Sequence, residues 1–166
     1  GVLKLYLYIV LPIRFLLNIF FFTKKIDLDL LERTSPDLYK KNINFLFEYF
    51  NSDKGEFFVD QYMQPIKKNY QKLPAHGYSK FYEKFFFDQK EKNYNILELG
   101  SFYGNGSASL FFYFKYSTIY SGDIYPDLFR YKSKRINNFF IDTSLEDSIK
   151  KTLLSKKISF DIIIED

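Results

Sequence analysis

Cysteine and tryptophan are absent from the 166-residue sequence, and histidine and methionine occur once each. Without cysteine, the chain can form neither a disulfide nor a metal site with thiolate ligands. The single histidine, His76, also excludes a zinc site built from several histidines. Glycine is scarce too, but three of the seven glycines lie between Gly100 and Gly106. This glycine-rich stretch carries the strongest functional signal in the sequence.

Aromatic residues are abundant, with 21 Phe and 15 Tyr. Phe, Tyr, Ile, Lys and Asn are frequent even in predicted loops, which indicates a compositional bias of the source genome rather than a binding surface. The net charge is +4, and the lysines occur as scattered pairs. Such pairs are more typical of a solvated surface than of a nucleic-acid-binding stripe, so no nucleic-acid partner is expected. The length suits one ordinary domain.

Residues 2–22 are strongly apolar but are interrupted by Lys4, Pro12, Arg14 and Asn18. A membrane-spanning helix needs about 20 apolar residues, and the pieces on either side of Arg14 are too short. No small-residue cleavage site of a secretory signal follows. Two interpretations stay open, a membrane anchor or interfacial segment and a helix packed on the domain or on a second subunit. The predicted location is cytoplasmic, with any membrane contact made through this segment.

The stretch from Asn95 to Leu110 reads NILELGSFYGNGSASL and predicts a strand, a glycine-rich turn and a helix. Glycines permit positive φ and close approach of a ligand, and the helix N-terminus offers unpaired N–H groups. The spacing G-x-x-x-G-x-G, with Glu98 two residues before the first glycine, differs from the G-x-G-x-x-G of dinucleotide folds. It resembles motif I of the class I S-adenosylmethionine-dependent methyltransferases.

The segment before this strand contains SDKG and, later, HGYSKFYEKFF. This pair resembles the lead-in of bacterial sugar and macrolide O-methyltransferases, where it lies along the cofactor pocket. The pocket residues implied by the resemblance are Asp53, Lys54, Gly55, His76, Tyr78 and Tyr82. The alternatives are an ordinary loop histidine and tyrosines that serve only packing.

Acidic residues follow the later predicted strands. A second strand, 118–123, ends in Asp123, where a carboxylate can hold a ribose diol. A third strand, 136–141, precedes Asp142, which by resemblance contacts the adenine amino group. Asp142 can alternatively cap the predicted helix 144–154.

A fourth apolar strand, 159–164, contains Asp161, which resembles the acid that opens motif IV. Such an apolar run is typical of a strand that helices cover on both faces. The covering helices are expected after Asp166, so Ile162, Ile163 and Ile164 are expected to be only partly buried. The resemblance implies that Glu165 and Asp166, at its carboxyl end, bind Mg²⁺ and approach the acceptor hydroxyl. The alternative is a charged strand end that merely keeps an edge soluble.

The remaining segments are predicted to be mainly helical. Residues 26–50 are expected to contain a helix that begins with Ser35 and Pro36. Its predicted stripe consists of Leu38, Asn42, Phe45, Leu46 and Tyr49. Ser79 is expected to cap a helix that carries Tyr82, Phe85 and Phe86. A further short helix is expected in 125–135.

The predicted fold is α/β, a Rossmann-like parallel sheet of the class I methyltransferase type, with its first four strands preceded by a helical region. The expected parts are an apolar N-terminal segment (1–25), a helical lead-in (26–90) and a partial cofactor-binding domain (91–166). The resemblance, which covers residues 51–166, implies further strands after Asp166, so the chain is expected to be inactive alone. It also implies that the fourth strand lies beside the first.

The resemblance implies methyl transfer from S-adenosylmethionine to a hydroxyl of a sugar-like or natural-product acceptor, with Mg²⁺ as a further candidate cofactor. His76 and Asp166 are the catalytic candidates. The cofactor-binding candidates are Glu98, Gly100, Ser101, Tyr103, Gly104, Gly106, Ser107, Asp123, Ile124, Asp142 and Tyr78. A nicotinamide-dependent oxidoreductase and a non-catalytic membrane-associated module remain alternatives, and a homo-oligomer is compatible with each.

Overall fold

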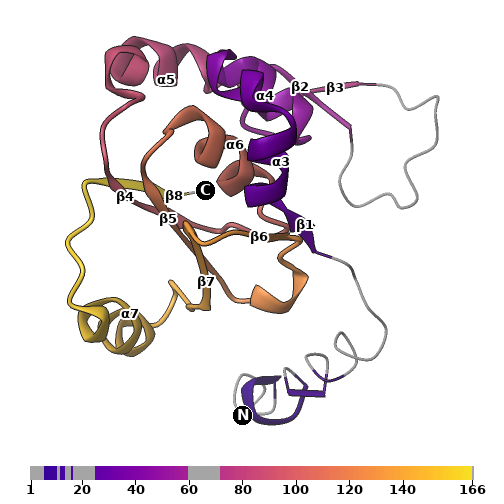
Figure 1. The fold of residues 1–166 in the computed structure, drawn as a ribbon. Helices are drawn as coiled ribbons and strands as arrows, with labels where there is room; N and C mark the ends of the chain where they lie inside the picture. Colours follow the sequence, from indigo (N-terminus) through magenta and orange to yellow (C-terminus); the bar gives the residue numbers. More distant parts are fainter. Residues whose placement is uncertain (1–5, 11, 14–15, 17–24, 60–71, 166) are drawn as a thin grey trace.

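The computed structural model describes residues 6–10, 12–13, 16, 25–59 and 72–165 (Figure 1). Its centre is a parallel sheet of four strands in the order β7-β5-β4-β8. The strands are Asn95–Leu99 (β4), Thr118–Asp123 (β5), Ile136–Phe140 (β7) and Ile162–Glu165 (β8). The α/β class, the four strands and the position of β8 beside β4 are therefore confirmed.

Helices lie on both sides of this sheet (Figure 1). On one side are α4 (Ile43–Tyr49), α5 (Ser79–Phe86) and α6 (Asn105–Tyr113), and on the other is α7 (Glu146–Leu153). The main core lies on the α6 side and is rich in aromatic rings. Its fully buried side chains include Leu28, Ile43, Leu46, Phe47, Ile96, Leu110, Phe111, Phe112, Phe114 and Ile119.

The strand β8 is only partly covered, as expected. Ile162 and Ile164 pack against the α6-side core, whereas Ile163 points the other way and is 62% exposed. The expectation that the isoleucines of this strand are at most partly buried is therefore confirmed. Alternation along a strand puts successive side chains on opposite faces, so an apolar run does not by itself demonstrate burial of both.

The lead-in divides into three short helices instead of one long one. These are α3 (Leu28–Thr34), the 3₁₀ helix η2 (Pro36–Lys40) and α4. Pro36 opens η2 as predicted, but Lys41 is extended, and Asn42 caps α4 by accepting the Phe45 N–H at 2.8 Å. Because the chain breaks at Lys41, the residues of α4 that face the core differ from those that one continuous helix would present. The predicted stripe is therefore wrong at Phe45 and Tyr49, which are 42% and 50% exposed.

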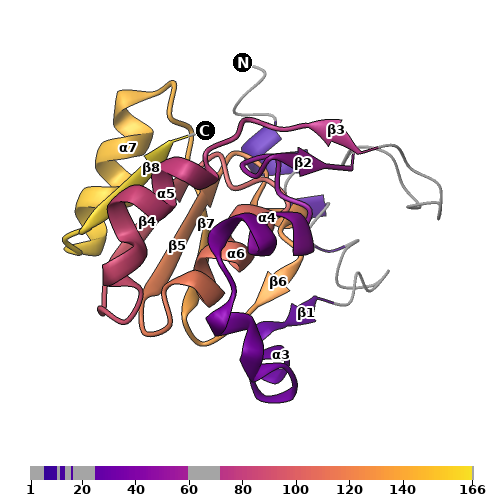
Figure 2. The same ribbon diagram turned by 90° about the horizontal axis from the view of Figure 1, so that it is seen from above.

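The short helix predicted in 125–135 is confirmed only at its first residues. This segment forms a 3₁₀ turn, Pro126–Leu128 (η4), and a strand, Tyr131–Lys132 (β6). The strand β6 pairs in parallel with Ile26–Asp27 (β1), and Figure 2 shows this pair beside α3, apart from the main sheet. Phe129 and Tyr131 are both buried and alternate with Arg130, which is the period of a strand rather than of a helix.

A hairpin brings the two halves of the lead-in motif together. Phe57–Phe58 (β2) pairs antiparallel with Leu73–Pro74 (β3). Beyond the strands, the N–H groups of residues 75–78 donate to carbonyl oxygens of residues 53–56 at 2.8–3.0 Å. Ser79 is the first residue of α5 rather than its N-cap, and its Oγ lies 2.8 Å from Asn44 Oδ1.

The apolar segment 2–22 lies largely outside the described residues. A π-helical turn, Tyr6–Val10 (η1), is described within it, and residues 12–13 and 16 are helical. Among the residues that the structure describes, no helix has the length and apolarity needed to cross a membrane.

Candidate functional site

The glycine-rich turn joins β4 to α6 with the backbone shape that its glycines predict. Gly100 has φ of 79° and Gly104 has φ of 82°, a region that favours glycine. The N–H groups of Gly100 and Ser101 donate to the Gly122 carbonyl oxygen at 3.0 and 3.2 Å. These two bonds fasten the turn to the end of the neighbouring strand β5.

Two of the glycines make room for the protein's own side chains. A Cβ at Gly104 would overlap the Phe129 ring, and a Cβ at Gly106 would overlap the Glu98 carboxylate. Glycine is therefore required at both positions by the packing of the protein itself. Gly100, by contrast, is exposed at the start of the turn.

Glu98 lies beneath the turn and is fully buried. Its Oε2 accepts a hydrogen bond from Ser107 Oγ, which in turn lies 2.7 Å from Ser121 Oγ. Its Oε1 lies 3.5 Å from the ammonium group of Lys54, which is itself only 3% exposed. The carboxylate therefore connects β4, α6, β5 and the lead-in.

Asp123 lies at the carboxyl end of β5, next to the turn. Its Oδ2 accepts the Phe102 N–H and its Oδ1 accepts the Tyr125 N–H, both at 2.7 Å. An ionised carboxylate has about four acceptor positions, so each oxygen can accept one further hydrogen bond. Ile124, the next residue, is 38% exposed, while Asp123 is 8% exposed. Tyr103 is half-buried, and the Arg130 guanidinium lies over its ring, with 3.5 Å between the guanidinium carbon and the ring centroid.

Asp142 follows β7, as predicted, and is 9% exposed. Its Oδ1 accepts both the N–H and the hydroxyl of Ser144, at 3.0 and 2.6 Å. Leu145 occupies the N-cap position of α7 and makes no side-chain cap bond, and the helix begins at Glu146. The alternative in which Asp142 caps this helix is therefore wrong, because its carboxylate closes a local turn instead.

Asp53, His76 and Tyr78 form a group on the hairpin. His76 Nε2 lies 3.9 Å from Asp53 Oδ2, and the His76 ring stacks on Tyr78 with 5.3 Å between centroids. The His76 side chain is 53% exposed. Tyr82 is separate from this group, since it is 4% exposed and packs edge-on against Phe47 in the core. Simple packing is therefore the correct interpretation for Tyr82.

The end of β8 supplies Glu165, which is exposed and in register with Leu99 of β4. Asp166 lies outside the described residues. Within the described ranges, no group of three or more His, Cys, Asp or Glu side chains could hold a metal ion. Asp161 lies at the opposite end of β8, where its Oδ2 accepts the Asn95 N–H at 2.8 Å and so fixes strand pairing.

The order of the strands in the sheet indicates the edge at which a ligand would bind. The first three strands, β4, β5 and β7, extend in one direction, and β8 lies on the other side of β4. In open α/β sheets, ligands bind outside the carboxyl ends of the strands where the order reverses. The glycine-rich turn and Glu165 both lie at that edge, beside β4.

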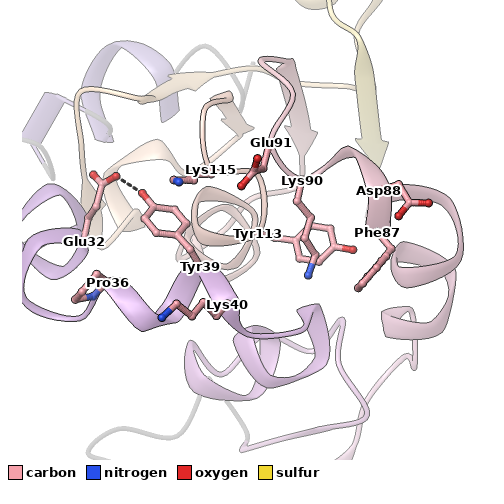
Figure 3. Close-up of a pocket in the computed structure, with 10 residues that line it drawn as sticks. All are labelled: Glu32, Pro36, Tyr39, Lys40, Phe87, Asp88, Lys90, Glu91, Tyr113 and Lys115. Atoms are coloured by element: carbon pink, nitrogen blue, oxygen red, sulfur yellow. Dashed lines mark hydrogen bonds between the residues drawn. The ribbon is translucent and has the colours of Figure 1, made fainter.

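A pocket of about 730 Å³ lies at the other edge, near the amino ends of β4 and β5. Figure 3 shows the rings of Tyr39 and Tyr113 facing it, with Lys90 beside Tyr113. Its lining contains three lysines and three acids, so it carries no net charge, and it contains none of the predicted site residues. Its lining residues are Glu32, Pro36, Tyr39, Lys40, Phe87, Asp88, Lys90, Glu91, Tyr113 and Lys115.

The lead-in motif predicts Lys54 as a pocket residue, but no pattern predicts its contact with Glu98. Phe102, whose φ of 41° presents its N–H to Asp123, carries no sequence signal either. No local pattern marks either contact, because both depend on residues that are distant in the sequence. No protein family and no curated protein matches this sequence.

Proposed function

We propose that this chain binds S-adenosylmethionine at the carboxyl edge of β4 and β5 and serves methyl transfer to a hydroxyl of a small sugar-like or natural-product acceptor. The observation that carries the proposal is the turn from Gly100 to Gly106. It has positive φ at two glycines, follows the central strand β4 and lies against Asp123 at the end of β5.

The donor and acceptor groups at this edge fit the proposed cofactor. Asp123 is held by two backbone N–H groups and keeps capacity for two hydroxyl donors, as a ribose diol requires. Gly100 is exposed, so its backbone allows close approach. Glu98 is buried against Lys54 and Ser107, and the proposal gives it the role of shaping the turn from below.

The bound cofactor would supply a methyl group activated by a positively charged sulfur. The residues of this chain would then hold donor and acceptor in line, which is catalysis by proximity and orientation. An acceptor hydroxyl must also lose its proton, and His76 is the exposed group that would take it as a general base. Glu165 and Asp166 are proposed as ligands of Mg²⁺, which would lower the acceptor pKa.

Calorimetry with S-adenosylhomocysteine tests the proposal on the purified chain. Asp123→Ala removes a charged hydrogen-bond acceptor, which typically costs about 1.5–3 kcal/mol, so affinity should fall by roughly one to two decades. Gly100→Val should abolish binding because the new side chain occupies the approach to the turn. Asp147→Ala, an exposed acid on α7, is the control and should bind like the unaltered chain.

Two results would contradict the proposal. One is undiminished affinity in folded Asp123→Ala and Gly100→Val variants. The other is a thermal shift with NAD but none with S-adenosylhomocysteine, which would favour the nicotinamide-dependent oxidoreductase instead.

A further inference from the structure

The ammonium group of Lys54 is buried at a place where stability alone does not require a lysine. Lys54 is 3% exposed and its Nζ lies 3.5 Å from Glu98 Oε1 and 4.0 Å from Asp53 Oδ1. Burying both charges carries a desolvation cost that the attraction between them only partly offsets. Replacing such a pair by neutral side chains of similar size is often neutral or stabilising. The position of the pair therefore calls for a role beyond stability.

On one side, the pair is built into the start of α6. Glu98 accepts the Ser107 hydroxyl, and the first turn of the helix closes so tightly over the carboxylate that only glycine fits at Gly106. The positive end of the helix dipole also favours a carboxylate here. The position of Glu98 consequently fixes where the glycine-rich turn ends and α6 begins.

On the other side, Lys54 is part of the segment that pairs with His76. Its carbonyl oxygen accepts the Tyr78 N–H at 3.0 Å, and the Asp53 carbonyl oxygen accepts the His76 N–H at 2.8 Å. The Asp53 carboxylate lies between the two side chains, 4.0 Å from Lys54 Nζ and 3.9 Å from His76 Nε2. Four ionisable groups thus form one continuous row from the buried Glu98 to the exposed His76.

We propose that Lys54 is a positioning residue that joins the glycine-rich turn to the segment carrying His76, so that occupation of the turn is transmitted to His76. The identity of the ligand rests on the proposed function. The link itself is made by residues of this chain and can be tested without a ligand.

The single histidine makes this link observable, since histidine labelled with ¹³C gives imidazole signals from His76 alone. In the unaltered chain, these signals should shift as S-adenosylhomocysteine reaches saturation. The double variant Lys54→Met/Glu98→Gln replaces the pair by neutral side chains of similar size. It should unfold at nearly the same urea concentration, bind S-adenosylhomocysteine at least tenfold more weakly, and show no shift of the His76 signals at saturation.

Lys72→Met is the matched control. Lys72 belongs to the same hairpin and lies 2.8 Å from Glu48, but its side chain is 62% exposed. Its removal should leave both the affinity and the His76 response unchanged. Lys54→Met alone leaves the Glu98 charge buried, so it should lower the unfolding midpoint more than the double variant does.

The outcomes separate a positioning role from a structural one. If the double variant equals the unaltered chain in stability, in affinity and in the His76 response, Lys54 is only structural and the inference is overturned. It is also overturned if the unaltered chain binds the ligand while its His76 signals stay fixed. If the unaltered chain does not bind S-adenosylhomocysteine, the proposed function fails. The ligand-free His76 signals then decide: they should differ between the unaltered chain and the double variant, and identical signals would overturn the link.

Discussion

The helices α6 and α7 flank the same parallel sheet from opposite sides, yet they are held very differently (Figure 1). All nine residues of α6 are buried, whereas none of the eight residues of α7 is. A helix that is buried on all sides belongs to the interior, whereas an amphipathic helix lies at the surface. The glycine-rich turn leads into the N-terminus of α6, so it is anchored to the more deeply buried side of the molecule.

The polar residues of α6 show how this helix is accommodated inside the core. Ser107 bonds to Glu98 and Ser109 Oγ donates to the Leu46 carbonyl oxygen at 3.1 Å. Asn105 Nδ2 donates to the Asn51 carbonyl oxygen at 2.9 Å. Buried polar groups are tolerated when they are paired, and each of these pairs also ties α6 to another element.

The largest expected difference comes from removing one leucine from each helix. Leu110 in α6 is fully buried, so Leu110→Ala should cost about 2–5 kcal/mol of unfolding free energy through lost contacts and a cavity. Leu153 in α7 is only partly buried, and Leu153→Ala should cost less than about 1 kcal/mol. Urea denaturation measures both, and equal losses would show that the two sides are equally packed.

The second expectation concerns high pH, because the α6 side contains buried tyrosines. Burial raises the pKa of Tyr131 to about 12 from the usual 10.0, and burial also raises the pKa of Tyr39 and Tyr113. The folded state therefore resists deprotonation, and this stabilisation is complete below pH 10 and is lost as the pH rises toward 12.

For Tyr131 the full loss should be on the order of 3 kcal/mol, at about 1.4 kcal/mol for each pKa unit. Urea midpoints measured across this pH range give the slope, and Tyr131→Phe isolates one contribution. A Tyr131→Phe variant with the full slope would show that this hydroxyl titrates as freely in the folded state as in the unfolded one.

A third expectation concerns the tight start of α6. Gly106→Ala forces a methyl group into the Glu98 carboxylate, and overpacking of this kind costs about 1–3 kcal/mol. Lys151→Ala on the exposed face of α7 should change stability by less than about 0.5 kcal/mol. Thermal denaturation compares the two variants. A stabilised Gly106→Ala protein would mean that Glu98 moves aside at little cost.

The smallest expected effect lies on α7. Lys150 Nζ is 2.5 Å from Glu146 Oε1, four residues earlier, and both side chains are well exposed. Glu146→Gln should cost only about 0.3–0.5 kcal/mol, since water and salt screen such pairs. The loss should vanish in high salt, whereas a loss that persists would indicate that α7 is held more firmly than its exposure suggests.

The sequence predicts the centre of this fold better than its surroundings. The strands β4 and β5 and the turn between them have strong local signals, namely apolar runs, glycines at positions of positive φ and acids at strand ends. The lead-in lacks such signals. Its helical pattern is continuous in the sequence, but the helix is interrupted at the extended Lys41 and begins again after Asn42, whose side chain caps α4. The 125–135 segment forms β6 rather than a helix because its distant partner β1 is available for pairing.

The candidate site shows the same limit. The positions of Asp123, Asp142 and Glu165 at strand ends follow from strand order, which local pattern and chain direction determine. The direction in which a side chain points does not follow in this way. Nothing in the sequence distinguishes Tyr82, which turns into the core, from Tyr78, which stacks on His76.

The pairing of β1 with β6 has a consequence for the order in which the chain folds. Ile26 N–H donates to the Arg130 carbonyl oxygen, and the Lys134 N–H reaches Asp29 across 105 positions of the chain. Closing so long a loop costs entropy that only a few hydrogen bonds offset, so this contact should form after the main sheet and open before it. Amide hydrogen exchange should accordingly be faster at Ile26 than at Ile119, whose N–H donates to the nearby Arg135 carbonyl oxygen within the main sheet.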